Sequence, residues 1–186
     1  YWRRSYELKV QNSDLAGQAD TLGEEGTYLL LYTQEYDRAL KLFSQALELV
    51  KKMGDEGAVS KLLNKAAMTR FKRVSTLGGA EGEAEQRSAL EGAQESLAIA
   101  LKLEREGDIL YAAKTVLECA ASLGDMDAFD AALVAASDRE TWAQFQKLGS
   151  MLESYEGLSS LCEDVERLEQ LEGIIAMVRA LLNERG

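Results

Sequence analysis

The side chains of this sequence that could do chemistry are carboxylates and two cysteines, because histidine is absent. The chain has 32 Asp and Glu residues, 21 Lys and Arg residues, and no His. The commonest general base, the usual catalytic triads and most transition-metal sites all depend on histidine. Cys119 and Cys162 therefore lack the partner that thiol catalysis needs. We expect both to be small buried residues of a reducing compartment.

Two short motifs resemble known ligand sites only superficially. The glycine-rich residues 78–82 are not followed by Lys and Ser or Thr, and no strand pattern precedes them, so they do not form a phosphate-binding loop. Asp125, Met126 and Asp127 begin like a calcium loop, but the later ligand positions are mostly apolar. The sequence therefore predicts no catalytic residue, no metal site and no cofactor, and we expect the chain not to be an enzyme.

The overall charge and hydropathy restrict the expected partners and location. A net charge of −11 disfavours nucleic acid and anionic membranes as partners. The sequence contains no run of about 18 apolar residues, so it predicts no transmembrane helix. We therefore expect a cytoplasmic protein of an intracellular, reducing compartment. The chain begins with Tyr1 and Trp2, without a methionine or an apolar signal core, and we interpret it as a piece of a longer protein.

Residues 36–50 are the part of the chain that most clearly predicts structure. Their apolar residues recur at the spacing of one helix face, and the charged residues fall on the other faces. Phe43 lies between two small residues, Ala39 and Ala46, so a neighbouring helix can approach closely on either side of its ring. Proline is absent from the whole chain, which favours helix throughout. The stripe consists of Tyr36, Ala39, Leu40, Phe43, Ala46, Leu47 and Val50.

Turn signals divide the helical chain into repeats. Ser13-Asp14, Gly54-Asp55 and Gly107-Asp108 each place an aspartate where it can cap the next helix, and the first two aspartates are 41 residues apart. Gly23 and Gly26 suit a helical hairpin because they allow close approach of its two helices. The prediction is an all-α solenoid of antiparallel helical hairpins forming one domain, residues 1–186. Its parts are the end of a preceding helix (1–13), repeat 1 (14–54), repeat 2 (55–107, with an inserted loop at about 75–86), repeat 3 (108–137) and C-terminal capping helices (138–186).

The spacing of Ala39, Phe43 and Ala46 resembles the second helix of a tetratricopeptide (TPR) repeat. Longer repeats with Gly-Asp turns are similar to a TPR subgroup that includes kinesin light chains, G-protein-signalling modulators and the sensor arms of bacterial regulatory ATPases and transcription factors. The resemblance covers residues 1–137, although the proline and the first-helix tryptophan of the standard repeat are missing. It implies an α-solenoid and a non-enzymatic scaffold role in binding a protein or peptide.

A basic stretch interrupts the acidic sequence and provides the candidate binding residues. Residues 58–80 include five Lys and Arg residues and no Asp or Glu. In the family that the chain resembles, the first helices of the repeats line a concave groove. A cationic groove beside two tyrosines would suit an acidic peptide or the terminal carboxylate of a peptide. Carrying the groove positions over by the 41-residue register gives Lys65, Thr69, Lys72 and Arg73 in the second repeat, and Glu24, Tyr28, Leu31 and Tyr32 at the matching positions of the first. The candidate binding residues are the two tyrosines, these four residues of the second repeat, Lys61 from the basic stretch, and Lys114 and Glu118 from the third repeat.

The sequence leaves several alternatives open. The basic residues could simply neutralise acids on neighbouring helices, and the two tyrosines could be core residues. The chain could instead be the sensor or regulatory arm of a larger signalling or transcription-regulating protein, binding its own effector domain or a small ligand. Trp2 and Tyr6, at the N-terminal end, are candidates for self-association.

Overall fold

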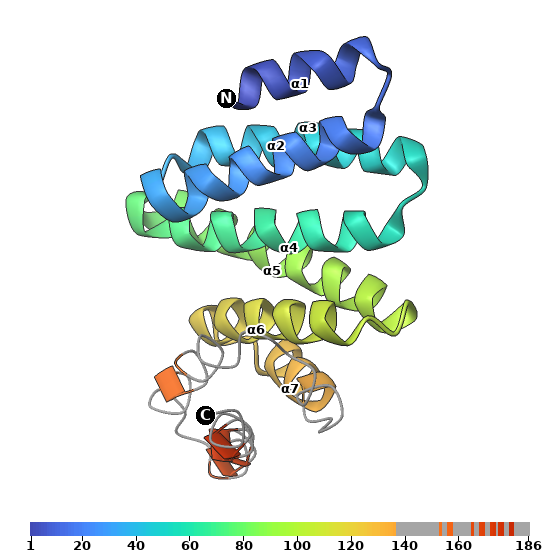
Figure 1. Ribbon diagram of the computed structural model, residues 1–186. Coiled ribbons are helices and arrows are strands. Elements are labelled where there is room, and N and C mark those ends of the chain that lie inside the picture. Colours follow the sequence, from blue (N-terminus) through green and yellow to red (C-terminus); the bar gives the residue numbers. More distant parts are fainter. Residues whose placement is uncertain are drawn as a thin grey trace. The chain divides into compact units, whose positions relative to one another are not determined.

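The chain folds into helices that follow one another along the sequence (Figure 1). They are α1 (Trp2–Gln11), α2 (Leu15–Tyr28), α3 (Tyr36–Met53), α4 (Glu56–Arg73), α5 (Gly79–Lys102), α6 (Glu106–Leu123) and α7 (Met126–Ala136), with a π-helix η1 (Leu29–Thr33) and a short 3-10 helix η2 (Val74–Thr76). This computed structural model describes residues 1–136 and, beyond them, residues 153, 156, 157, 165, 168, 169, 172, 173, 175, 176, 179 and 180. The predicted all-α class is confirmed, while the predicted capping helices of residues 138–186 lie largely outside the described residues.

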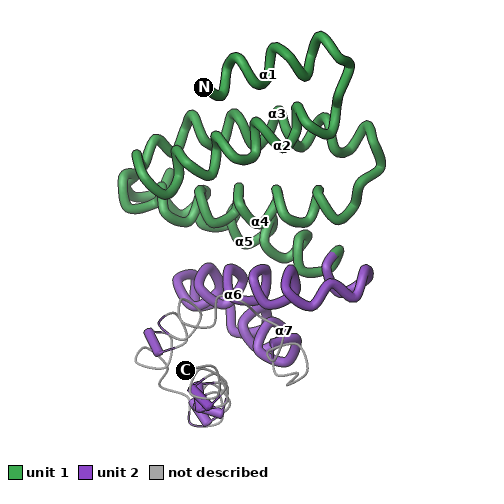
Figure 2. The backbone as a smooth tube through the Cα atoms, in the orientation of Figure 1, with its two compact units in different colours: residues 1–99 green, residues 100–186 purple. Residues whose placement is uncertain are grey.

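The chain divides into two compact units, residues 1–99 and residues 100–186 (Figure 2). In the first unit α1 packs on α2, α2 on α3 and α3 on α4, so that consecutive helices form antiparallel hairpins. In the second unit α6 packs on α7 in the same way. This sequential packing is the arrangement of an α-solenoid.

Helix α3 provides the centre of the first unit's core, as its apolar stripe predicts. Ala39, Phe43 and Ala46 are all 0% exposed, and Val50 is 2% exposed. Gly26 of α2 lies against the aromatic ring, because a Cβ atom added there would be 2.8 Å from Cε1 of Phe43. A missing side chain on α2 therefore makes room for a large one on α3, and the predicted close approach at Gly26 is confirmed.

Aspartate caps start the helices at two of the predicted positions. Asp14 accepts a hydrogen bond from the backbone N–H of Gly17 (2.8 Å), and Asp55 accepts one from that of Ala58 (2.9 Å). Each bond satisfies a donor that the first turn of a helix leaves without a partner. Gly54 ends α3 in the left-handed conformation, with φ 71°, which glycine adopts without steric cost.

The predicted start of the third repeat, with Asp108 as the helix cap, is wrong by three residues, because the N-cap of α6 is Arg105. Helix α6 begins at Glu106, so Asp108 lies inside its first turn and forms an ion pair with Arg105 (2.7 Å). The left-handed residue of the preceding turn is Glu104, with φ 51°, rather than a glycine. Asp108 still stabilises the helix, because its negative charge lies near the positive end of the helix dipole.

The predicted loop at about residues 75–86 is also wrong. Helix α5 already begins at Gly79, which leaves only Leu77 and Gly78 between it and η2. The glycines of this stretch indicate a loop, but Gly82 is buried in α5, and a Cβ atom there would meet Val74 and Leu77 at 3.8–3.9 Å. The extra residues of the second repeat therefore lengthen a helix.

Two buried serines join α4 to the part of α5 in the first unit. Ser60 Oγ donates to the carbonyl of Ser96 (3.0 Å), and Ser96 Oγ donates to the carbonyl of Ser60 (2.8 Å). Both residues are at most 1% exposed. Reciprocal bonding satisfies both hydroxyls, so these small side chains allow close packing without an unpaired polar atom.

Candidate binding surface

The candidate residues of the first unit come from two neighbouring helices, α2 with its extension η1, and α4. A Cβ atom at Gly23 of α2 would meet Cδ2 of Leu62 in α4 at 3.4 Å, so the two helices lie side by side. Both run in the same direction, and their aspartate caps are 41 residues apart in the sequence. The face that they expose together is called the α2–α4 face below.

Tyr28, Leu31 and Tyr32 form an exposed apolar group at the end of α2, called the tyrosine patch below. Their exposed fractions are 46%, 50% and 75%. The two rings lie with their centroids 5.3 Å apart and their planes tilted by 33°. The tyrosines are thus surface residues, as a binding role requires, rather than core residues.

The π-helix η1 produces this exposure. Leu29 and Leu30 are buried (5% and 2% exposed), while the two residues that follow them face outward. Glu35 N–H donates to the carbonyl of Leu29 (3.2 Å), and Gln34 has a left-handed backbone with φ 55°, which is uncommon for a residue with a side chain. π-Helical turns occur frequently at functional sites. The sequence pattern places Leu31 and Tyr32 near the right face but gives no sign of this wider turn.

The lysines of α4 differ in how far they are available to a partner. Lys61 and Lys72 are exposed and form no ion pair with any residue that the structure describes, whereas Lys65 is half-buried. Thr69 is 0% exposed, and its hydroxyl donates to the carbonyl of Lys65 (2.7 Å). Thr69 therefore belongs to the helix packing, and its predicted contact with a ligand is wrong.

Arg73 is engaged with acids on two other helices. Its guanidinium donates to Asp37 of α3 and forms an ion pair with Glu85 of α5 (2.8 Å), and Arg70 lies 3.9 Å from the same Glu85 carboxylate. Burial alone would lower the pKa of Arg73, but its hydrogen bonds to Glu85 and Asp37 outweigh this effect and raise the pKa. For Arg70 and Arg73 the alternative of charge neutralisation therefore holds. Glu85 could not be anticipated as their partner, because it lies in the segment predicted to be a loop.

Lys114 and Glu118 belong to α6 in the second unit. Lys114 Nζ lies 3.1 Å from a carboxylate oxygen of Glu118, one helical turn away, and both side chains are largely buried (17% and 22% exposed). They neutralise each other. The neighbouring Cys119 is 0% exposed, and burial raises the pKa of its thiol to about 12. Its expected burial is confirmed, whereas Cys162 lies outside the described residues.

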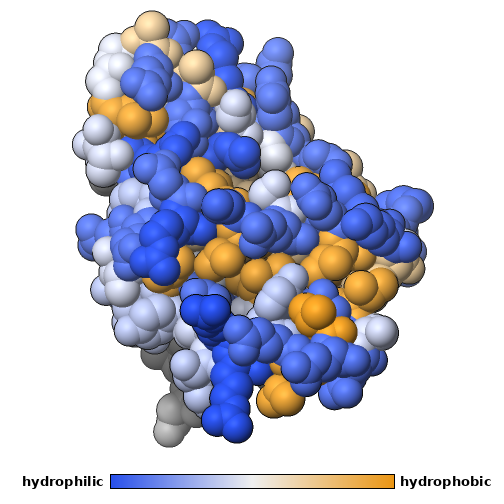
Figure 3. All heavy atoms as spheres, turned by 90° about the horizontal axis from the view of Figure 1, so that it is seen from above, coloured by the Kyte–Doolittle hydropathy of each residue, from blue (hydrophilic) through white to orange (hydrophobic). Residues whose placement is uncertain are grey.

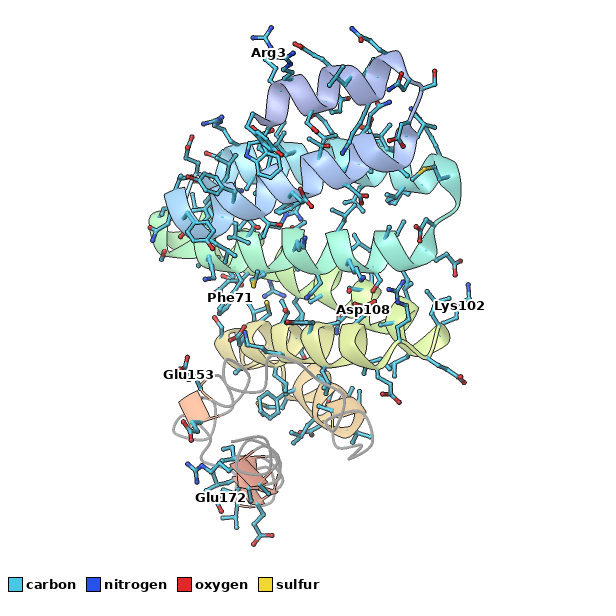
Figure 4. The ribbon with its side chains drawn as sticks, in the orientation of Figure 1. Arg3, Phe71, Lys102, Asp108, Glu153 and Glu172 are labelled. Carbon is cyan, nitrogen blue, oxygen red and sulfur yellow. The ribbon has the colours of Figure 1, made fainter. Side chains whose placement is uncertain are left out.

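In helix α1 the exposed apolar residues are not the two that were predicted to mediate self-association, Trp2 and Tyr6. Tyr6 packs against the core of the first unit, and Trp2 is half-buried with the Tyr1 ring edge-on to it at 5.8 Å. The exposed apolar side chains of the helix are instead Leu8 (52%) and Val10 (48%). The view onto this end of the first unit shows apolar areas among hydrophilic ones (Figure 3), and Arg3 of α1 projects outward (Figure 4).

Two kinds of site do not occur among the residues that the structure describes. No group of three or more His, Cys, Asp or Glu side chains there could hold a metal ion. None of the described helices is long and apolar enough to cross a membrane.

Comparisons with known proteins give no family. No family model matches the chain, and no curated protein matches it. Among solved structures, a de novo designed helical repeat protein is similar, with 17% identity, 97% of this chain and 86% of that chain covered, and a TM-score of 0.42. A likeness of this level identifies neither a family nor a function.

Proposed function

We propose that this protein is a non-enzymatic interaction module that binds a peptide or protein segment on the α2–α4 face. The observation that carries the proposal is the tyrosine patch, in which three large apolar side chains are exposed together. The neighbouring helix α4 adds two exposed lysines, Lys61 and Lys72, that form no ion pair with any described residue. Tyrosine offers rigid contact area with one polar tip, and aromatic residues are enriched at protein interfaces.

The proposal includes a TPR-like repeat of the longer, Gly-Asp-linked type. Its support is the α2–α3 hairpin, which starts at the Asp14 cap and ends at the left-handed Gly54. The small and large residues that carry the family resemblance, Ala39, Phe43 and Ala46, are all fully buried at the centre of that hairpin. Their role in packing is the one that the resemblance implies.

Capture of partners from a cell lysate, followed by mass spectrometry, tests the proposal. The variant Lys61→Glu/Lys72→Glu reverses the two exposed charges of the α2–α4 face. Arg73 is left unchanged, because its ion pairs with Asp37 and Glu85 make it part of the fold. The control Lys41→Glu/Lys52→Glu makes the same change on α3, where Lys52 occupies a last helical turn as Lys72 does in α4.

The expected result is a partner that is captured by the wild type and by the control but lost in the α2–α4 variant. Circular dichroism must show equal helix content in all three proteins. A partner that is retained equally by both variants would move the binding surface elsewhere. No reproducible partner in any sample would contradict the interaction role itself.

A further inference from the structure

We propose that the tyrosine patch is the anchor for a partner segment in which a large apolar residue is flanked by Asp or Glu, with the acidic residue placed at Lys72. This inference rests on the proposed interaction role and gives the chemistry of the partner. The chemistry of the partner segment follows from three properties of the surface: its exposed apolar area, its irregular backbone at η1 and Gln34, and its exposed charges that pair with no described residue.

The patch is built to present apolar surface. Leu31 and Tyr32 follow two buried leucines within a single π-helical turn, and the left-handed Gln34 then redirects the chain toward α3. A π-helical turn and a left-handed non-glycine residue are both less favourable than regular helix. Three exposed apolar side chains within five residues are more than scattered surface residues. A large apolar residue of a partner would remove this area from water.

Most charges around the patch are already paired. Glu35 pairs with Arg38, and Asp37 pairs with Arg73. Glu85 occupies Arg70 and Arg73 together. Lys72 is the exposed charge near the end of α4 that pairs with no described residue.

Lys72 lies at the same end of the unit as the patch. The Arg73–Asp37 ion pair ties the end of α4 to the first turn of α3, and only Gln34 and Glu35 separate α3 from η1. A carboxylate next to the apolar anchor would therefore meet an uncommitted cation.

The exposed Glu24 gives the segment a direction. It lies one turn before Tyr28 on α2, on the side away from Lys72, and it pairs with no residue that the structure describes. Glu24 is thus a negative charge one helical turn before the patch, and Lys72 is a positive charge near its other end. An acidic residue of the partner is favoured at the Lys72 end and disfavoured near Glu24.

Fluorescence polarisation with three short labelled peptides tests the inference on the full chain. The first has a Leu-Phe pair flanked on each side by two glutamates. The second replaces the glutamates with lysines, and the third replaces the Leu-Phe pair with serines. We expect only the first to bind. Tyr32→Ser should weaken its binding about tenfold or more, because it removes an anchor ring.

Three further variants separate charge from apolar contact. Lys72→Gln should weaken binding of the glutamate peptide a few-fold and reduce its dependence on salt, whereas Glu24→Gln should strengthen binding modestly. Lys41→Gln on α3 is the control and should have no effect. These side chains are all exposed, so each variant should keep the wild-type melting temperature.

The inference is overturned if the glutamate peptide does not bind, if the lysine or serine peptide binds equally well, or if Tyr32→Ser leaves binding unchanged. The proposed interaction role is judged separately by the lysate experiment. If a captured partner depends on Lys61 and Lys72 but the glutamate peptide fails to bind, the proposed interaction role stands and the tyrosine patch is not the anchor for an acidic segment.

Discussion

A charged side chain on a helix is available to a partner only when no neighbouring helix has already neutralised it. Arg73 and Lys72 are adjacent in the sequence, yet Arg73 bridges Asp37 and Glu85 while Lys72 is exposed. The sequence identifies the basic stretch, but it cannot tell these two residues apart. Their difference depends on Glu85, which comes from another helix and is 13% exposed.

Substitution of the two residues should therefore affect stability to different extents. Arg73→Ala leaves the poorly exposed Glu85 carboxylate without its main partner and should lower the free energy of unfolding by about 1–3 kcal/mol. Lys72→Ala should change it by no more than about 0.5 kcal/mol, because the side chain is exposed. Urea unfolding followed by circular dichroism measures both. Equal effects of the two substitutions would contradict the assignment of Arg73 to the fold.

The thiol of Cys119 should be unreactive in the folded protein. Burial raises its pKa to about 12, so at pH 8 roughly one molecule in ten thousand carries the reactive thiolate. In a Cys162→Ser variant, iodoacetamide should modify Cys119 at least about a hundredfold more slowly in buffer than in denaturant, as measured by mass spectrometry. A native rate within about tenfold of the denatured rate would show that the second unit opens readily.

The same pKa shift predicts alkaline destabilisation. The folded protein keeps the Cys119 proton up to about pH 12, whereas an unfolded chain releases it near pH 8.5. Between these values the folded state binds more protons, so the free energy of unfolding falls as pH rises, by at most about 1.4 kcal/mol per pH unit for this group. The raised pKa of Tyr111, caused first by burial and then by Asp108, acts in the same direction. Urea unfolding at pH 8 and pH 10 should show the loss, and Cys119→Ala should reduce it.

At the scale of the elements, the sequence predicts what depends on neighbours along the chain. The stripe of α3, the aspartate caps of α2 and α4 and the turn at Gly54 are all fixed by local spacing. The start of α5 is not fixed by local spacing. Its glycines favour a loop, but the buried packing of Gly82 and the ion pairs of Glu85 with α4 favour a helix and outweigh them.

The two helical glycines Gly26 and Gly107 should respond oppositely to alanine. A Cβ atom at Gly26 would lie 2.8 Å from the ring of Phe43, which is 0% exposed and has no room to move. Gly26→Ala should therefore destabilise the protein by about 1–3 kcal/mol. A Cβ atom at Gly107 would lie in open space, so Gly107→Ala should stabilise α6 by up to about 1 kcal/mol. Thermal unfolding compares the two, and a neutral Gly26→Ala would mean that α2 and α3 pack less tightly than described.

At the scale of the whole molecule, the tyrosine patch illustrates how much of a candidate binding surface a sequence can predict. Of the residues that the family register selects, Tyr28, Leu31, Tyr32 and Lys72 are exposed. The register fails for Thr69, which is buried, and for Arg73, which is already paired. Residue type and repeat position thus predict which side chains are exposed on the α2–α4 face. Which of its charges remain without an ion-pair partner depends on packing between helices.

Net charge belongs to the whole chain, and it predicts which polymers the protein avoids. At −11, with a sequence pI near 4.6, we expect the molecule to be repelled by the phosphate backbone, and the two exposed lysines of the α2–α4 face would release too few counterions to compensate. A labelled DNA duplex at about 50 mM salt, where electrostatic binding is strong, should show no saturable change in fluorescence anisotropy. An acidic peptide differs because it carries few charges and reaches Lys72 at contact distance, while a Debye length of about 10 Å at 0.1 M salt screens the distant acids. Saturable DNA binding that disappears in Lys61→Glu/Lys72→Glu would show instead that the α2–α4 face selects anions in general rather than an apolar segment with an acidic flank.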